Sequence, residues 1–209
     1  MRPPFYSAMN TTAFISFIEN HLTQSRIDHS LRVAQAARSL ASHYGIDPTV
    51  AECAGILHDV AKYLSPEKTQ QFTPAFRSNL NHVWETYPLV WHQFAGAEMA
   101  KIQFPELGTE IIDAIKWHTT GTKNMSPLAQ IIYIADYIEP GRPFPTRAII
   151  ETLAYSDIDQ ATYGLAYLSL QQLLSAQIPI YPESTECHNF YLSKIGKKNA
   201  KVVAHLLTL

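Results

Sequence analysis

Apolar residues recur at helical spacing along almost the whole chain. The first predicted helix starts at Thr11 or Thr12, either of which can cap it, and ends near Gln24; its apolar stripe consists of Phe14, Ile15, Phe17, Ile18 and Leu22. A second helix is expected from about Arg26 to Tyr44, because Gly45 suits the left-handed position that follows a helix end.

A third helix is expected to begin after Asp47, whose side chain can cap it, with Pro48 in the first turn, where a missing N–H costs nothing. The segment GILHDVAKY, residues 55–63, is assigned to this helix. Further helices are predicted over residues 94–103, 107–117, 127–138, 157–176 and 190–207. Strand signals are scarce, so residues 1–209 are predicted to form a single all-α domain, a bundle of roughly eight to ten helices.

The composition fits a globular protein and argues against several classes of function. With 209 residues, 46% hydrophobic and 16% charged, the chain can bury a substantial core. A net charge of -2 gives no general reason to bind nucleic acid or an anionic membrane, so an anionic ligand needs a local site. We expect a cytoplasmic protein, because the sequence lacks both the apolar core of a secretory signal and the ~18 consecutive apolar residues of a membrane span. Cys53 and Cys187 form no CxxC pair, which argues against a disulfide framework or a structural zinc site.

His58 and Asp59 interrupt the buried stripe of the third predicted helix. Ala51, Ala54 and Leu57 share the face at whose edge His58 lies. A buried imidazole needs hydrogen-bond partners, and a buried carboxylate beside it costs several kcal/mol unless a cation neutralises it. This pair alone does not decide the matter, because a single inward histidine is more often a hydrogen-bonded core residue than a metal ligand.

Similar positions on three other predicted helices hold polar residues. His29, His118 and Asp136 each lie three or four residues from an apolar position on the same face. Independent accidents of packing would seldom place such residues on the inward edges of four helices, so the pattern predicts a metal site. His92 precedes the helix expected to begin near Phe94. The remaining histidines lie in polar, loop or terminal contexts and are expected to have no such role: His21, His43, His82, His188 and His205.

The order of these histidines and aspartates resembles the HD-domain superfamily of metal-dependent phosphohydrolases, over roughly Ser25 to Pro140. The phrases RIDHSLRVA, GILHDVAK, AIKWHTTG and IIYIADYIEPGRPFP are closer still to the YqeK family, whose members hydrolyse dinucleoside tetraphosphates symmetrically. The tail IPIYPESTECHN looks like that family's C-terminal nucleotide-contacting segment, with Tyr181 where the family usually has histidine. This resemblance implies a motif core at about residues 25–142 and C-terminal helices that complete a nucleotide pocket.

The resemblance also implies roles for individual residues. It points to one iron ion held by His29, His58, Asp59 and Asp136, a mixture of ligands that also suits manganese or another divalent first-row metal. A second metal at His92 and His118 is the alternative to contact between these histidines and the nucleotide. The implied catalytic residues are Asp59, Lys62, His92 and His118. The implied nucleoside diphosphate pocket consists of Arg26, Ile27, Asp28, His29, Asp59, Val60, Ala61, Lys62, His92, His118, Thr119, Asp136, Arg142, Tyr181, Pro182, Glu183, Ser184, Thr185 and Glu186.

The expected activity is therefore hydrolysis of diadenosine tetraphosphate to two ADP. Lys62 follows Asp59 by three residues, so its ammonium can reach a phosphate at the metal, and Arg26 and Arg142 can bind phosphate oxygens in pairs. One alternative is an HD phosphohydrolase for another nucleotide. Another is a nucleotide-sensing module without turnover, against which the complete His/Asp set argues. The sequence leaves the oligomeric state open, with a homodimer among the states it allows.

Overall fold

The computed structural model describes residues 10–69 and 82–208. Within these residues the regular structure is helical and no β-strand occurs, so the predicted all-α fold is confirmed. The main helices are α1 (Thr11–Glu19), α2 (Gln24–His43), α3 (Pro48–Leu57), α4 (Pro66–Thr69), α6 (Trp91–Gln103), α7 (Thr109–Lys116), α8 (Pro127–Ile138), α9 (Arg147–Ser156), α10 (Ile158–Ser175) and α11 (Pro182–Leu206). A 3-10 turn, η2 (Pro88–Val90), precedes α6, and residues 82–86 are also helical.

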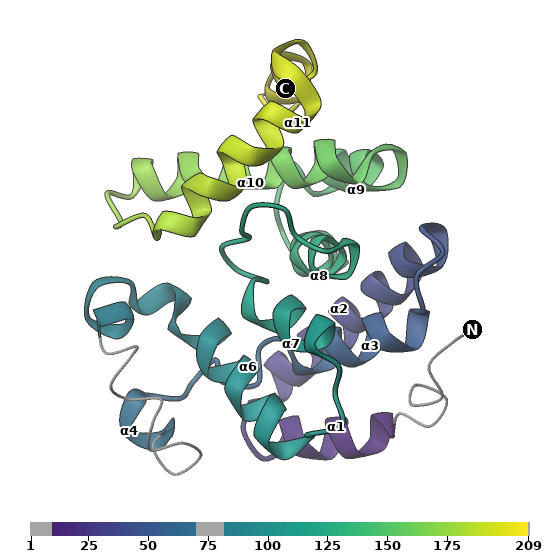
Figure 1. Cartoon of the computed structure of the whole chain (residues 1–209), viewed down its shortest axis with the longest axis vertical. Coiled ribbons are helices and arrows are strands. Elements are labelled where there is room, and N and C mark those ends of the chain that lie inside the picture. The colour runs from purple at the N-terminus through teal and green to yellow at the C-terminus, as the bar shows by residue number, and fades with distance from the viewer. Residues whose placement is uncertain (1–9, 70–81, 209) are drawn as a thin grey trace.

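Helix α8 lies in the middle of the molecule (Figure 1). Helices α2, α3 and α7 pack against it from below in this view, and α9 and α10 pack against it from above. The last helix, α11, runs along α10, and the apolar side chains of all these layers form one continuous core. In the described parts of the chain, no helix combines the length and the apolar character needed to cross a bilayer.

Some predicted helix ends agree with the structure and others do not. Helix α8 has the predicted bounds, Asp47 accepts a hydrogen bond from the Thr49 amide at 2.9 Å, and Gly45 has a φ of 67°. The prediction of a first helix that reaches Gln24 is wrong, because α1 ends at Glu19. Its cap is Asn10, whose side chain accepts a hydrogen bond from the Ala13 amide at 3.3 Å, instead of either predicted threonine.

The third helix ends earlier than its apolar pattern predicts. Helix α3 stops at Leu57, His58 is its C-cap residue, and residues 58–63 continue as turns. These turns are closed by short-range bonds, from the Val60 amide to the Leu57 carbonyl at 3.1 Å and from the Lys62 amide to the Asp59 carbonyl at 2.9 Å. Because such turns keep nearly helical spacing, the side chains of His58 and Asp59 still point inward although these residues no longer belong to the helix.

Three other assignments also change. Helix α6 begins at Trp91 instead of Phe94, so His92 lies within its first turn. The sequence pattern did not predict α9, which follows the proline-rich segment 140–145. The last helix begins at Pro182, well before the predicted start at residue 190, and it is kinked at Gly196, whose φ is 77°. His188 therefore lies in a helix and not in a loop.

Close packing of α2 against α3 brings His29 on α2 near His58 and Asp59, which follow α3. Gly55 lies so near α2 that a Cβ atom added to it would be 2.6 Å from the Cα of Ala34. Only glycine allows this approach, because any side chain would force the two helices apart. The face of α2 that carries His29 therefore lies against the end of α3, where His58 and Asp59 follow.

Candidate metal centre and phosphate site

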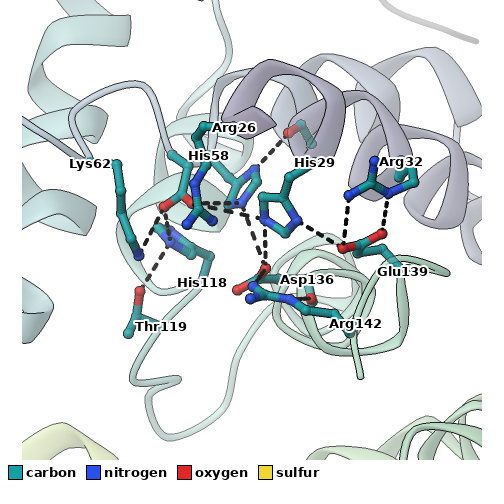
Figure 2. A network of polar contacts seen from close by, with 12 residues as sticks. Arg26, His29, Arg32, His58, Lys62, His118, Thr119, Asp136, Glu139 and Arg142 are labelled. Carbon is teal, nitrogen blue, oxygen red and sulfur yellow. Dashed lines mark hydrogen bonds and ion pairs between the residues drawn. The ribbon is translucent and has the colours of Figure 1, made fainter. Parts of the chain in front are cut away.

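The four predicted metal ligands come together from three parts of the fold, and Figure 2 labels His29, His58 and Asp136 among them. His29 lies on α2, His58 and Asp59 follow α3, and Asp136 lies in the last turns of α8. Ligand atoms of His29, His58 and Asp59 are within 4.8 Å of one another. Nε2 of His29 is 3.1 Å from Oδ1 of Asp136, and Nε2 of His58 is 3.8 Å from the same oxygen. The four residues thus face one small volume.

Backbone carbonyl groups fix the orientation of the His58 and His118 imidazoles. Nδ1 of His58 lies 2.7 Å from the Gly55 carbonyl, and Nδ1 of His118 lies 2.7 Å from the Ile115 carbonyl. A ring nitrogen that faces a carbonyl carries a hydrogen and donates a hydrogen bond to the carbonyl oxygen. Nε2 of each ring therefore presents its lone pair to the site.

Asp59 is shared between two groups of ligands. Its Oδ2 lies 3.5 Å from Nε2 of His58, whereas its Oδ1 lies 3.2 Å from Nε2 of His92 and 3.4 Å from Nε2 of His118. Nε2 of His92 and Nε2 of His118 are 3.1 Å apart, and the Thr119 hydroxyl is within 3.1 Å of both nitrogens. Ligand atoms of Asp59, His92 and His118 therefore form a second group with metal-ligand spacing.

Unpaired buried atoms test whether a cation fits this cluster. Within residues 10–69 and 82–208, Nε2 of His29, Nε2 of His58 and Oδ1 of Asp59 are buried without a hydrogen-bond partner of acceptable geometry. All three are electron-pair donors, and leaving them unsatisfied costs free energy. A divalent cation held by the two imidazoles and the Asp59 carboxylate would satisfy the two nitrogens, so the donors present fit a first-row metal ion.

Protonation states in the cluster suit metal binding. Burial lowers the pKa of His58 to about 3 and that of His92 to about 4. Burial alone would raise the pKa of Asp59 and Asp136, but the neighbouring histidines, together with Arg142 for Asp136, hold both pKa values well below their usual range. Near neutral pH the site therefore offers His58 and His92 as neutral imidazoles and Asp59 and Asp136 as ionised carboxylates, which are the forms that bind metals.

Basic side chains surround the cluster. Nη1 of Arg26 lies 3.0 Å from Oδ2 of Asp59, and Nζ of Lys62 lies 3.4 Å from Oδ1 of the same carboxylate. Arg142 pairs with the Asp136 carboxylate and also donates from Nε to the Asp136 carbonyl at 3.0 Å. All three cations are partly exposed, so an anion that enters from solvent can reach them.

The comparisons with known proteins agree with this geometry. An HD domain matches residues 26–141. The chain is 32% identical to a symmetrical bis(5'-nucleosyl)-tetraphosphatase of Bacillus subtilis over 88% of this chain and 99% of the relative. It is 33% identical to the protein of the same name from Halalkalibacterium halodurans, over 87% of this chain and 96% of the relative. The chain belongs to the YqeK family of HD-domain proteins.

A solved member of the superfamily shares the fold. The crystal structure of a predicted HD superfamily hydrolase involved in NAD metabolism, from Clostridium acetobutylicum, has a TM-score of 0.82 and 30% identity. The match covers 90% of this chain and 100% of that protein. An HD domain implies a divalent metal, and this family member has a cluster of His and Asp residues with metal-ligand spacing.

Glu139 lies beside the His/Asp cluster, and the sequence pattern missed it. Its Oε1 lies 3.1 Å from Nδ1 of His29, and its other oxygen accepts hydrogen bonds from Nε of Arg32 at 2.5 Å and the Gly141 amide at 2.6 Å. Burial would raise the pKa of Glu139, but these donors hold it below its usual value. The available signal was a second acidic residue three positions after Asp136, at the end of a helix that is otherwise apolar.

Gln93 is a second residue that was missed. Its side-chain oxygen accepts hydrogen bonds from the amides of Thr119 at 3.1 Å and Thr120 at 3.2 Å, and its Nε2 donates to the Thr120 hydroxyl at 3.1 Å. This buried glutamine ties the first turn of α6 to the turn that follows α7. It thereby fixes the position of His92 relative to His118 and Thr119.

The remaining predicted pocket residues lie in different surroundings. Ile27, Val60 and Ala61 are buried in the core, so their side chains do not face solvent. Asp28 is exposed and accepts a hydrogen bond from Gln24 at 2.8 Å. Contacts between these four residues and a nucleotide stay a prediction, and for the three buried ones only backbone atoms are available.

Residues 181–186 form the start of α11 beside the site. The Tyr181 ring packs against Tyr87 and Phe94, with ring centroids 5.1 and 5.5 Å apart. Gly121, with a φ of 62°, lies so close to Cys187 that a Cβ atom added to it would be 2.5 Å from the Cys187 sulfur. The first turns of α11 are therefore joined to the turn that carries His118 and Thr119. The role predicted for Pro182, Glu183, Ser184, Thr185 and Glu186 in nucleotide binding is not tested by these contacts.

Proposed function

We propose that this protein is a metal-dependent phosphohydrolase that cleaves dinucleoside tetraphosphates symmetrically, so that diadenosine tetraphosphate gives two ADP. One observation carries the proposal: two imidazole nitrogens and a carboxylate oxygen converge without hydrogen-bond partners, and three cations surround them. The relatives named as symmetrical bis(5'-nucleosyl)-tetraphosphatases support the choice of substrate.

His29, His58, Asp59 and Asp136 would hold the metal. We propose iron, as the family resemblance implies, and manganese or another first-row divalent ion suits the same donors. When bound, such an ion supplies positive charge to phosphoryl oxygens and makes water a better nucleophile near neutral pH. The ion is thus expected to be required for turnover.

The basic residues bind the polyphosphate. Arg26 and Arg142 flank the carboxylates, and their planar guanidinium groups suit paired contacts with phosphate oxygens. Lys62 lies on the side of Asp59 that faces His92, and its Nζ is 3.0 Å from Nε2 of His92. Together they neutralise the negative charge that otherwise protects a phosphoanhydride from attack.

His92 and His118 are the proposed proton-handling pair. Their Nε2 atoms are 3.1 Å apart, so one proton can be held between them and passed to the departing phosphate oxygen. The Thr119 hydroxyl, within 3.1 Å of both nitrogens, helps to keep them in place. We therefore assign catalytic roles to Asp59, Lys62, His92 and His118.

The position of cleavage follows from how the substrate is anchored. Residues 26–142 would grip a nucleoside diphosphate through its phosphates, and Tyr181 to Glu186, at the start of α11, would hold its nucleoside. The C-terminal helices thereby complete the pocket, and residues 1–209 act as one domain. With one end anchored, the second phosphorus would face His29, His58, Asp59 and Asp136, so both products would be nucleoside diphosphates. A cytoplasmic location and a homodimer stay predictions.

The test is separation of nucleotides during the initial rate, with added iron or manganese and in isotopically labelled water. Diadenosine tetraphosphate should give ADP alone, with label in one of the two ADP molecules, and ADP should inhibit competitively. AMP and ATP in equal amounts would refute the anchoring. Faster turnover of another nucleotide in a panel would favour the other phosphohydrolase, and metal and nucleotide binding without turnover would favour the sensing module.

A further inference from the structure

A cavity of about 340 Å³ opens beside the phosphate site. At its inner end it is lined by Lys62 and His92, and its walls include Tyr63, Trp84, Leu89 and Trp91. Its volume lies within the range of about 300–1,000 Å³ that small-molecule sites occupy. The walls come from the turns after α3, from residues 82–86, and from η2 with the start of α6.

The walls of this cavity are unusually apolar for a surface. The Tyr63 side chain is 52% exposed, Trp84 is 38% exposed and Leu89 is 57% exposed. Large apolar side chains that are exposed singly need no explanation, but several that gather around one hollow indicate a binding site. The Trp84 ring rests edge-on against the buried Trp91, with ring centroids 5.8 Å apart, which holds Trp84 in place.

Polar contacts connect the cavity to the phosphate-binding cations. Lys62 lines the cavity and also lies 3.4 Å from Asp59. The Tyr63 side chain interacts with Thr23 and Arg26, which lowers the pKa of Tyr63. A ligand whose phosphates lie along Arg26 and Lys62 can therefore place its other end among the aromatic side chains.

We propose that this cavity binds the second nucleoside of the dinucleoside tetraphosphate, the one that departs with the leaving diphosphate. The inference rests on the proposed function, in which the start of α11 holds the first nucleoside. A symmetrical substrate carries a base at both ends, and nucleobases bind to proteins by stacking on aromatic side chains. Tyr63 and Trp84 offer such faces, and Lys62 lies between them and the cluster to receive the phosphates of the leaving half.

A second cavity, of about 580 Å³, is the competing location. It lies between Tyr137, Phe144 and the end of α10, and glutamine and serine side chains line much of it. Among the described residues that line it there is neither a cationic side chain nor a member of the metal cluster, although Arg142 reaches the Phe144 ring from outside. A ligand there would have no cation comparable to Lys62, which lines the first cavity and also lies beside Asp59.

The test compares two substrates that differ by one nucleoside. Adenosine 5'-tetraphosphate has the same phosphates as diadenosine tetraphosphate but no second base. Trp84→Ala and Leu89→Ala should lower kcat/KM for the dinucleotide about tenfold, mainly through KM, and leave kcat/KM for adenosine 5'-tetraphosphate nearly unchanged. Trp84→Phe, which keeps an aromatic face, should recover most of the loss. Tyr155→Ala, which removes an exposed aromatic ring on α9, is the control and should affect neither substrate.

The proposal would be overturned if Trp84→Ala and Leu89→Ala lowered kcat/KM equally for both substrates, or did not lower kcat/KM for the dinucleotide. So would a loss confined to the dinucleotide in Phe144→Ala, because it would place the second nucleoside in the larger cavity. Binding of a methylene-bridged analogue of diadenosine tetraphosphate to the metal-loaded protein separates this inference from the proposed function. If the wild type makes no ADP but Trp84→Ala still weakens analogue binding and not ADP binding, the function is wrong and the cavity assignment stands. If the wild type forms ADP and both Trp84→Ala and Leu89→Ala bind the analogue as tightly as the wild type does, only the cavity assignment is wrong.

Discussion

Glu139 lies 3.1 Å from Nδ1 of His29, on the side of the ring that faces away from the metal cluster (Figure 2). Because the carboxylate is ionised, it accepts a hydrogen bond from the Nδ1–H group and leaves Nε2 as the unprotonated nitrogen that faces Asp136. Arg32 and the Gly141 amide hold the carboxylate in turn, so the orientation of one metal ligand depends on a chain of three contacts.

Removal of this carboxylate should weaken metal binding without removing a ligand. We expect Glu139→Ala to lower the affinity for iron or manganese by about 10- to 100-fold, and Glu139→Gln to have a smaller effect because its amide oxygen still accepts a hydrogen bond. Competitive metal titration measures both. Glu151→Ala, which removes a surface carboxylate paired with Arg147, is the matched control and should bind metal as the wild type does. Unchanged affinity in Glu139→Ala would show that His29 orients without it.

Asp59→Ala should abolish hydrolysis and lower the metal content while the helical fold survives. Both oxygens of Asp59 face histidines of the cluster, so its removal takes a ligand from a cation that the core surrounds. Elemental analysis, far-ultraviolet circular dichroism and product assay measure the three effects. Full activity in this variant would contradict the metal assignment.

Lys62→Ala should keep the metal and lose turnover. The Lys62 ammonium is partly exposed and 3.4 Å from Asp59, which suits a contact with phosphate better than a role in holding the metal. We expect a normal metal content with a higher KM or a lower kcat for diadenosine tetraphosphate. Loss of metal from this variant would mean that Lys62 supports the cluster itself.

His92→Ala and His118→Ala decide between one metal and two. If these histidines only contact the substrate, the metal content per chain should stay near that of the wild type, and the rate should fall by about 100-fold, the scale of a positioned proton donor. If the Asp59, His92 and His118 group holds a second ion, the metal content should fall by about half. Elemental analysis of both variants beside the wild type separates the two outcomes.

The metal-free protein should lose stability as the pH falls below about 6.5. Burial keeps the pKa of His58 at about 3 and that of His92 at about 4, whereas in the unfolded chain both titrate near about 6.5. The unfolded state therefore binds protons that the folded state does not, so the free energy of unfolding decreases from pH ~6.5 toward pH ~4. Each histidine contributes a slope of up to about 1.4 kcal/mol per pH unit.

Denaturant unfolding across this pH range measures the slope. His92→Gln should reduce it, and His205→Gln, at an exposed position of α11, should not. The same slope in the wild type and in His92→Gln would show that His92 is not the group responsible.

The sequence predicted that His29, His58 and Asp136 point inward, because each one breaks an apolar pattern, and their role as metal ligands stays a prediction. His29, His58 and Asp136 occupy places where helical spacing calls for an apolar side chain, and no other feature of the sequence is needed to see this. The end of α3 was not predicted, because the turns after Leu57 keep a near-helical spacing that the periodicity does not distinguish from a helix.

Other features depend on contacts that spacing does not reveal. Glu139 follows the end of α8, and only the fold brings it beside His29 on α2. Tyr63, Trp84 and Leu89 come from three short segments, none of which has a pattern of its own, and the cavity exists only where these segments meet. Helix α9 was missed because the prolines before it read as a turn and its apolar stripe is short.

The contact between Gly121 and Cys187 has a consequence for how the protein is made. Chains leave the ribosome from the N-terminus, and domains begin to fold in that order. The proposed metal ligands, from His29 to Asp136, emerge before the start of α11, which rests on the turn after His118. A nascent chain can thus assemble the metal cluster before it can hold a nucleoside. The proposed hydrolysis therefore begins only when α11 has docked on this turn.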